Sequence, residues 1–206
     1  MLAFSVACIV EGHGEVPAVP ILIRRLVELV NPAVYANVQR PIRKPRGTLL
    51  REGGIEGAVE LAVRGLPVPG SVLIIIDSDD SCPKELAPEL LTRALRTAAG
   101  RRPVGVVLAK MEFESWFIAA AESIAGHSSL PPGLCAPADP ESIRDAKGWL
   151  QKAMPPGRKY SETIDQPSLA QVRSQRRPAR AVLRQDVPRD RTFLFSRDSG
   201  LKWNKP

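Results

Sequence analysis

Three short apolar runs lie in the part of the chain before residue 110, and each is closely followed by carboxylate side chains. The runs cover residues 2–10, 72–76 and 103–109 and are rich in Val, Ile and Leu. Continuous apolar runs of this length are typical of strands buried on both faces of a parallel sheet. A fourth strand is predicted over residues 33–42.

Apolar residues recur at helical spacing between and after these runs. The spacing predicts helices over residues 18–30, 57–66, 83–100, 116–124 and 140–153, with a Pro-rich loop over 130–140. Strands that alternate with helices in this way indicate an α/β fold with a doubly wound, mostly parallel central sheet flanked by helices.

Carboxylates follow three of the predicted strands. Glu11 comes after the first strand, Asp77 and Asp79 after the run over 72–76, and Glu114 shortly after the run over 103–109. The carboxyl ends of parallel strands meet at one edge of a sheet, where α/β proteins place their ligands. Carboxylate oxygens suit Mg²⁺ or Mn²⁺, and alternation along an extended chain would put Asp77 and Asp79 on the same side. For D-S-D-D alone, a solvated acidic turn is the alternative. Asp80 is expected either to cap the following helix or to support the site without binding the metal directly.

The turn after the first strand reads E-G-H-G-E. Gly12 and Gly14 allow a tight turn with unusual backbone angles. Glu15 lies near a helix start, where a carboxylate is also favoured by the helix dipole alone. The turn is neither a dinucleotide fingerprint nor a P-loop.

Basic residues next to these elements are candidates for contact with phosphates. Lys110 could stabilise charge on a phosphate or pair with a neighbouring glutamate. Two loops carry the others, and solvated loops are the alternative for both: Arg43, Lys44 and Arg46 in one, Arg158 and Lys159 in the other.

The net charge of +7 is confined to the end of the chain. Residues 1–171 carry 19 basic and 19 acidic side chains, whereas residues 172–206 carry ten Arg or Lys and three Asp. We therefore expect a folded domain over 1–171 and a basic, Arg/Pro-rich tail over 172–206 that is partly disordered. No apolar run approaches the roughly 20 residues of a membrane span. The three cysteines lack C-x-x-C spacing, which favours a cytoplasmic setting.

Four segments together resemble a known group of proteins: V-E-G-H-G-E, I-I-D-S-D-D-S-C-P, A-K-M-E-F-E-S-W-F and G-R-K-Y-S-E-T-I-D-Q-P. They resemble an uncharacterised bacterial Toprim-like family of unknown function, and the Toprim nuclease domain of overcoming-lysogenization-defect (OLD) proteins. In that resemblance Glu11 matches the glutamate after the first Toprim strand, and Asp77 with Asp79 matches the Asp-x-Asp pair. Glu15 and Glu114 match the two further glutamates of OLD-type nucleases. The tail after Gln171 departs from the expected ending, and the chain carries no ATPase motif.

The resemblance implies a Mg²⁺- or Mn²⁺-dependent nuclease or related phosphotransfer enzyme, with DNA favoured over RNA as substrate. Glu11, Asp77, Asp79 and Glu114 would hold the metal, with Glu11 or Glu15 as proton acceptor. It also implies phage defence together with a separate ATPase of the ABC/structural-maintenance type, and leaves a homodimer open. The alternative is a non-catalytic partner or regulatory subunit of such an ATPase. A receiver-like phosphoacceptor that uses Asp77 would explain neither Glu11 nor Glu114.

Overall fold

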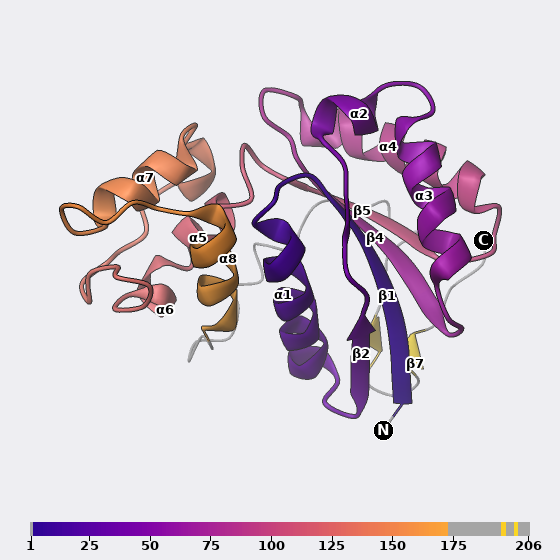
Figure 1. The fold of residues 1–206 in the computed structure, drawn as a ribbon, viewed down its shortest axis with the longest axis horizontal. Coiled ribbons are helices and arrows are strands. Elements are labelled where there is room, and N and C mark those ends of the chain that lie inside the picture. Colours follow the sequence, from indigo (N-terminus) through magenta and orange to yellow (C-terminus); the bar gives the residue numbers. More distant parts are fainter. Residues whose placement is uncertain (1, 173–194, 197–199, 202–206) are drawn as a thin grey trace.

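A computed structural model describes residues 2–172, 195–196 and 200–201. It contains a five-stranded sheet of order β2-β1-β4-β5, with β3 also beside β1, and every strand pair in this sheet is parallel (Figure 1). The strands are β1 (Leu2–Val10), β2 (Val34–Val38), β3 (Ile42–Arg43), β4 (Gly70–Asp77) and β5 (Val104–Ala109). The predicted α/β class with a mostly parallel sheet flanked by helices is confirmed.

The predicted strand over 33–42 is two strands that both lie along β1. Residues 34–38 pair with the first half of β1, and Ile42 and Arg43 pair with its last two residues. The interruption falls at residues 39–41, where Pro41 has no N–H to donate to a ladder.

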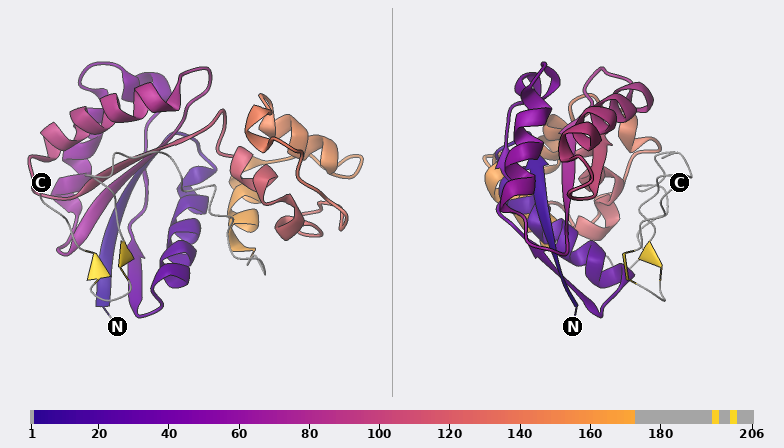
Figure 2. Two further views of the ribbon diagram at one scale, coloured as in Figure 1. Left: turned by 180° about the vertical axis from the view of Figure 1, so that it is seen from behind. Right: turned by 90° about the vertical axis from the view of Figure 1, so that its right-hand side faces the viewer.

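Helices cover both faces of the sheet (Figure 2). On one face, α1 (Glu15–Val30) packs on Val6, Cys8 and Val10, and on the other α3 (Gly54–Gly65) and α4 (Pro83–Ala98) pack on Ala7 and Ile9. Alternate residues of β1 thus pack into two separate hydrophobic cores, one on each face of the sheet, as expected for a strand buried on both faces.

The strand order reverses next to β1. The chain leaves β1 to form β2 on one side and later returns to form β4 on the other side. In open α/β sheets such a reversal opens a crevice between the carboxyl ends of the two central strands. Here those ends belong to β1 and β4, and we call the region between them the crevice.

A helical lobe follows β5 and lies beside α1 (Figure 1). It consists of α5 (Ser115–Ala119), α6 (Ala121–Ile124), the 3-10 turn η1 (Pro140–Ser142), α7 (Ala146–Ala153) and α8 (Glu162–Gln171). The predicted helix over 116–124 is therefore split at Ala120, and the one over 140–153 becomes a 3-10 turn followed by α7. Helix α8 begins beside the start of α1, at the carboxyl edge of the sheet, and packs along α1.

The other predicted elements are confirmed with shifted ends. Helix α1 begins at Glu15, not Ala18, and α3 begins at Gly54. Part of the expected basic loop is the short helix α2 (Arg46–Leu50). The expected disorder of the tail falls mainly outside the described residues, which there include β6 (Phe195–Ser196) paired antiparallel with β7 (Gly200–Leu201). None of the helices in the described ranges is long and apolar enough to cross a membrane.

Candidate metal centre

Three carboxylates from three strand ends lie around the crevice between β1 and β4. Glu11 directly follows β1, Asp77 ends β4, and Glu114 precedes α5 in the turn after β5. Glu114 is fully buried, Asp77 is 9% exposed and Glu11 is half-buried. One buried oxygen of each finds no hydrogen-bond partner among the described residues: Glu11 Oε2, Asp77 Oδ1 and Glu114 Oε2. We refer to these three atoms as the unpartnered oxygens.

The pKa values show that the acidic groups of the crevice act on one another. Burial raises the pKa of Asp77 to about 9, and repulsion from Glu15, Glu11 and Glu114 adds to the rise. Burial likewise raises the pKa of Glu15 to about 7, with further repulsion from Glu11 and Glu114. Burial and the charge of Asp79 raise the pKa of Glu11. Keeping all these groups ionised at neutral pH therefore requires a nearby positive charge.

The donor set is chemically suited to a hard divalent cation, because it consists only of carboxylate oxygens. As the side chains lie, however, no group of three or more His, Cys, Asp or Glu residues in the described part of the chain is arranged to hold a metal ion. The carboxylates share one crevice without converging on a single point. The residues therefore suit a hard cation in two respects: their ligand atoms are carboxylate oxygens, and three of these oxygens lack a hydrogen-bond partner among the described residues.

Glu15 closes the turn between β1 and α1. Its Oε2 accepts a hydrogen bond from the Glu11 N–H at 3.2 Å, and its Oε1 accepts one from the Gly12 N–H at 3.0 Å. It is the first residue of α1, so its charge also complements the helix dipole. Glu15 thus braces the loop that carries Glu11.

The turn does not use the left-handed angles that glycine allows. Gly14 has the ordinary helical angles φ −69° and ψ −31°, and neither Gly12 nor Gly14 has a positive φ. Gly14 is needed for space instead. A Cβ on Gly14 would lie 2.4 Å from the Glu162 carbonyl oxygen and 2.5 Å from Gln166 Oε1, so α8 abuts the start of α1 directly.

Asp79 does not share the environment of Asp77. Strand alternation ends at Asp77, and Asp79 adopts a left-handed φ of 46° while its N–H donates to the Met111 carbonyl oxygen at 3.1 Å. Its half-exposed side chain pairs with Arg46 Nε at 3.3 Å. Asp79 therefore lies near Glu11, whose pKa it raises, but on the outer side of the crevice.

The expected capping role of Asp80 is also wrong. Its exposed carboxylate pairs with Arg144. Helix α4 instead follows Cys82, with Pro83 at its first position and no side-chain cap from the described residues.

Two of the arginines predicted to meet phosphates are engaged inside the protein. Arg46 donates to the carbonyl oxygens of Asp77 and Ser78, both at 3.1 Å, and to Ser81 Oγ at 2.7 Å, and so wraps the acidic loop. Arg158 pairs with the buried Asp165 at 2.5 Å. Of the other three candidates, Arg43 Nη1 donates to the Glu11 carbonyl oxygen at 3.4 Å, and Lys44 and Lys159 are exposed.

We call Glu11, Glu15, Asp77 and Glu114 the acidic cluster. Lys147, which the sequence pattern did not indicate, lies close to Glu114 and Asp77 of this cluster. Burial alone would lower the pKa of Lys147, but Glu114, Glu112, Glu162 and Asp77 around it raise that pKa above its usual value. Lys110, the lysine favoured from sequence, lies 3.8 Å from Glu141 and is 46% exposed.

Two further residues missed from sequence hold the second oxygen of Glu114. Tyr160 Oη donates to Glu114 Oε1 at 3.1 Å, and Gln166 Nε2 donates to the same atom at 2.8 Å. Burial raises the pKa of Tyr160, and the charge of Glu114 beside it raises that pKa further.

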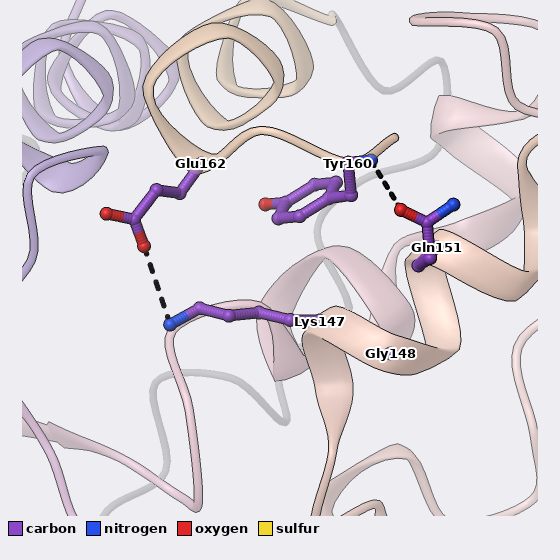
Figure 3. A pocket seen from close by; sticks show the side chains of 5 residues that line it. All are labelled: Lys147, Gly148, Gln151, Tyr160 and Glu162. Atoms are coloured by element: carbon purple, nitrogen blue, oxygen red, sulfur yellow. Dashed lines mark hydrogen bonds and ion pairs between the residues drawn. The ribbon is translucent and has the colours of Figure 1, made fainter. Parts of the chain in front are cut away.

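Tyr160 also lines a pocket of about 280 Å³ beside the crevice (Figure 3). The other lining residues are Lys147, Gly148, Gln151 and Glu162, and Lys147 Nζ lies 3.5 Å from Glu162 Oε2 across the pocket. The acidic cluster therefore adjoins an open space with a lysine at its wall.

Comparisons with protein-family models, with curated proteins and with solved structures found no match.

Proposed function

We propose that the chain is a Mg²⁺- or Mn²⁺-dependent nuclease, or a related phosphotransfer enzyme, that acts on nucleic acid. The observation that carries this proposal is the set of three unpartnered oxygens at the ends of β1 and β4 and just beyond β5. A buried polar atom without a partner costs about 1–3 kcal/mol, and more when it is charged. Ligation of a divalent cation, toward which these side chains would have to turn, would relieve that cost.

The resemblance to Toprim-like and OLD-type nuclease domains supports the same conclusion. It requires a glutamate after the first strand and acidic residues after a later strand of a parallel sheet. Glu11 and Asp77 lie at the carboxyl ends of neighbouring strands here, since β1 pairs with β4. Glu114 lies beyond β5, the next strand of the same sheet.

Each residue has a chemical role in this proposal. Glu11, Asp77 and Glu114 would hold the cation, and Asp79 is an outer ligand once it leaves Arg46. The cation would supply Lewis-acid polarisation of the scissile phosphate and lower the pKa of a water molecule. Lys147 replaces Lys110 as the group that neutralises charge developing on the phosphate.

Glu15 is the better proton acceptor of the two candidates. Burial raises its pKa toward the neutral range in which proton transfer is most effective. Each of its oxygens accepts one backbone hydrogen bond and so retains a second lone pair. Glu11, in contrast, is committed to the cation through its unpartnered oxygen.

The experiment is a cleavage assay with purified protein on supercoiled DNA, nicked DNA, single-stranded DNA and RNA, each in Mg²⁺, Mn²⁺ and EDTA. We expect cation-dependent cleavage that D77N and E114Q reduce by more than the roughly 10–100-fold typical of outer-shell substitutions. E60Q is the matched control, because Glu60 lies on α3 and pairs with Arg101. If the wild-type protein cuts none of these substrates, or D77N cuts as well as wild type, the proposal fails.

One observation favours a second candidate, a non-catalytic partner subunit of an ABC/structural-maintenance-type ATPase. Residues 1–171 are electrically neutral, and Arg46 and Arg158 are committed to internal contacts. A nuclease acting alone would be expected to offer a basic groove to its substrate. Co-purification with such an ATPase that survives the combined substitution of Glu11, Asp77 and Glu114, without nuclease activity in the wild-type complex, would support this candidate over the first.

A further inference from the structure

We propose that Tyr160 and Gln166 are positioning residues of the metal centre, which hold Oε1 of Glu114 so that its Oε2 is the oxygen left for the cation. The inference rests on the proposed function, because it names the residues that orient one of the proposed ligands. Both residues come from the last part of the helical lobe, far along the chain from the strands that carry the acids.

The contacts around Glu114 divide its two oxygens sharply. Oε1 accepts hydrogen bonds from Tyr160 Oη at 3.1 Å and from Gln166 Nε2 at 2.8 Å. Oε2 is equally enclosed and is one of the three unpartnered oxygens. Two donors on a single oxygen fix the plane of the carboxylate, and in this way outer-shell hydrogen bonds orient metal ligands.

The buried amide of Gln166 makes one hydrogen bond, to Glu114, and leaves its own oxygen unpaired among the described residues. It is 2% exposed, and a carboxylate can only accept, so the amide must turn its Nε2 toward Glu114. This orientation leaves Gln166 Oε1 against Gly14, where it is buried without a hydrogen-bond partner in the described chain. An apolar side chain of similar shape would avoid that unpaired carbonyl.

The loop that contains Tyr160 is held by Gln151 of α7 and by Asp165 of α8. Gln151 Oε1 accepts from the Tyr160 N–H at 2.7 Å (Figure 3). Gln151 Nε2 donates to the Arg158 carbonyl oxygen at 2.8 Å. Asp165, which is 1% exposed, pairs with Arg158 and also accepts from the Ser161 N–H at 2.7 Å. Arg158, expected from sequence to contact a phosphate, thus serves with Asp165 to place the tyrosine.

The test is a calorimetric titration of the full chain with Mn²⁺. We expect Y160F and Q166M each to weaken Mn²⁺ binding by about tenfold, within the range for outer-shell residues, and E114Q to weaken it further. The matched controls are Y35F, on the exposed face of β2, and Q39M, whose amide donates to Gly65. If the wild type cleaves nucleic acid, saturating Mn²⁺ should restore the cleavage rate of Y160F and Q166M but not that of E114Q.

Thermal unfolding in EDTA shows whether each variant is folded, and if Q166M is not, Y160F decides because it retains the ring. Wild-type affinity in Y160F and Q166M, with loss of binding in E114Q, would overturn this inference and leave the proposed function standing. A wild-type protein that does not bind Mn²⁺ would overturn both.

Discussion

Two groups of acidic side chains in this protein are treated in opposite ways. On the outside of α3, Glu56 and Glu60 each contact arginines, with Arg93 Nε 2.7 Å from Glu56 Oε1 and Arg101 Nη2 2.5 Å from Glu60 Oε2. Hydrogen bonds from Arg101 and Arg64 lower the pKa of Glu60 to about 2, and the one from Arg93 lowers the pKa of Glu56. At the ends of β1 and β4 burial and mutual repulsion raise the pKa values instead.

The ion-pair partners lie where they are needed least. An exposed carboxylate is stable in water without a partner, and a surface ion pair contributes little. A buried carboxylate needs compensation far more, yet the described chain supplies the arginines on the surface and leaves the unpartnered oxygens in the crevice. An external cation would remove the difference between the two groups, and the following predictions test that idea, from the largest effect to the smallest.

The largest expected effect is stabilisation by the cation. At a Mn²⁺ concentration 100 times its dissociation constant, the free energy of unfolding should rise by about 2.7 kcal/mol. Denaturant unfolding with and without Mn²⁺ measures this rise. D77N should lose most of it and E60Q should keep it, so equal stabilisation of D77N and wild type would place the cation elsewhere.

A smaller effect is expected from D77N without metal. Asp77 has a pKa of about 9 in the folded protein against an ordinary 3.8, so between these values the folded state keeps a proton that the unfolded state has lost. The free energy of unfolding of the wild type therefore falls as pH rises through this window, whereas Asn cannot ionise. We expect D77N in EDTA to be more stable than wild type at pH 8, because ionised Asp77 destabilises the folded state and Asn does not.

That advantage of D77N should disappear below about pH 3, where Asp77 is mostly protonated in both states. Unfolding in denaturant at a series of pH values follows the difference. A constant difference across the series would show that Asp77 is not the group responsible.

The smallest effect concerns the surface pair, and its pH dependence has the opposite sign. Because the folded-state pKa of Glu56 is lowered, its pairing with Arg93 stabilises the protein above the ordinary pKa of 4.5 and is lost as pH falls through the lowered value. E56Q should cost about 0.5 kcal/mol at pH 7, the size typical of a partly exposed pair. In acid the same variant should match wild type, and an E56Q penalty that grew in acid would contradict the assignment.

The sheet and the acidic strand ends were accessible from sequence because each depends on a local signal. Apolar runs predict buried strands, and carboxylates directly after them must lie at one edge of a parallel sheet. Asp79 shows where local inference ended: alternation holds only while the chain stays extended, and a left-handed residue directly after the strand breaks it.

The residues around Glu114 could not be predicted, since their roles depend on how the lobe folds back. Helix α8 contains Pro167 and lacks a clear apolar stripe, so the segment resembled a loop. No feature of the sequence around Lys147 distinguishes it from a surface lysine. Arg46 and Arg158 appeared available for phosphates because their partners, such as Asp165, are identified only by the three-dimensional structure.

The bare Cα of Gly14 against α8 limits how this protein can diverge. Most neighbours of a functional site can be exchanged one at a time, since a displaced side chain finds another rotamer. At position 14 the nearest obstacle is the backbone carbonyl of Glu162, which has no rotamer to change. Any larger residue there would need a compensating shift of the whole helix that carries Gln166. In related chains, position 14 and the entry to α8 should therefore change together or not at all.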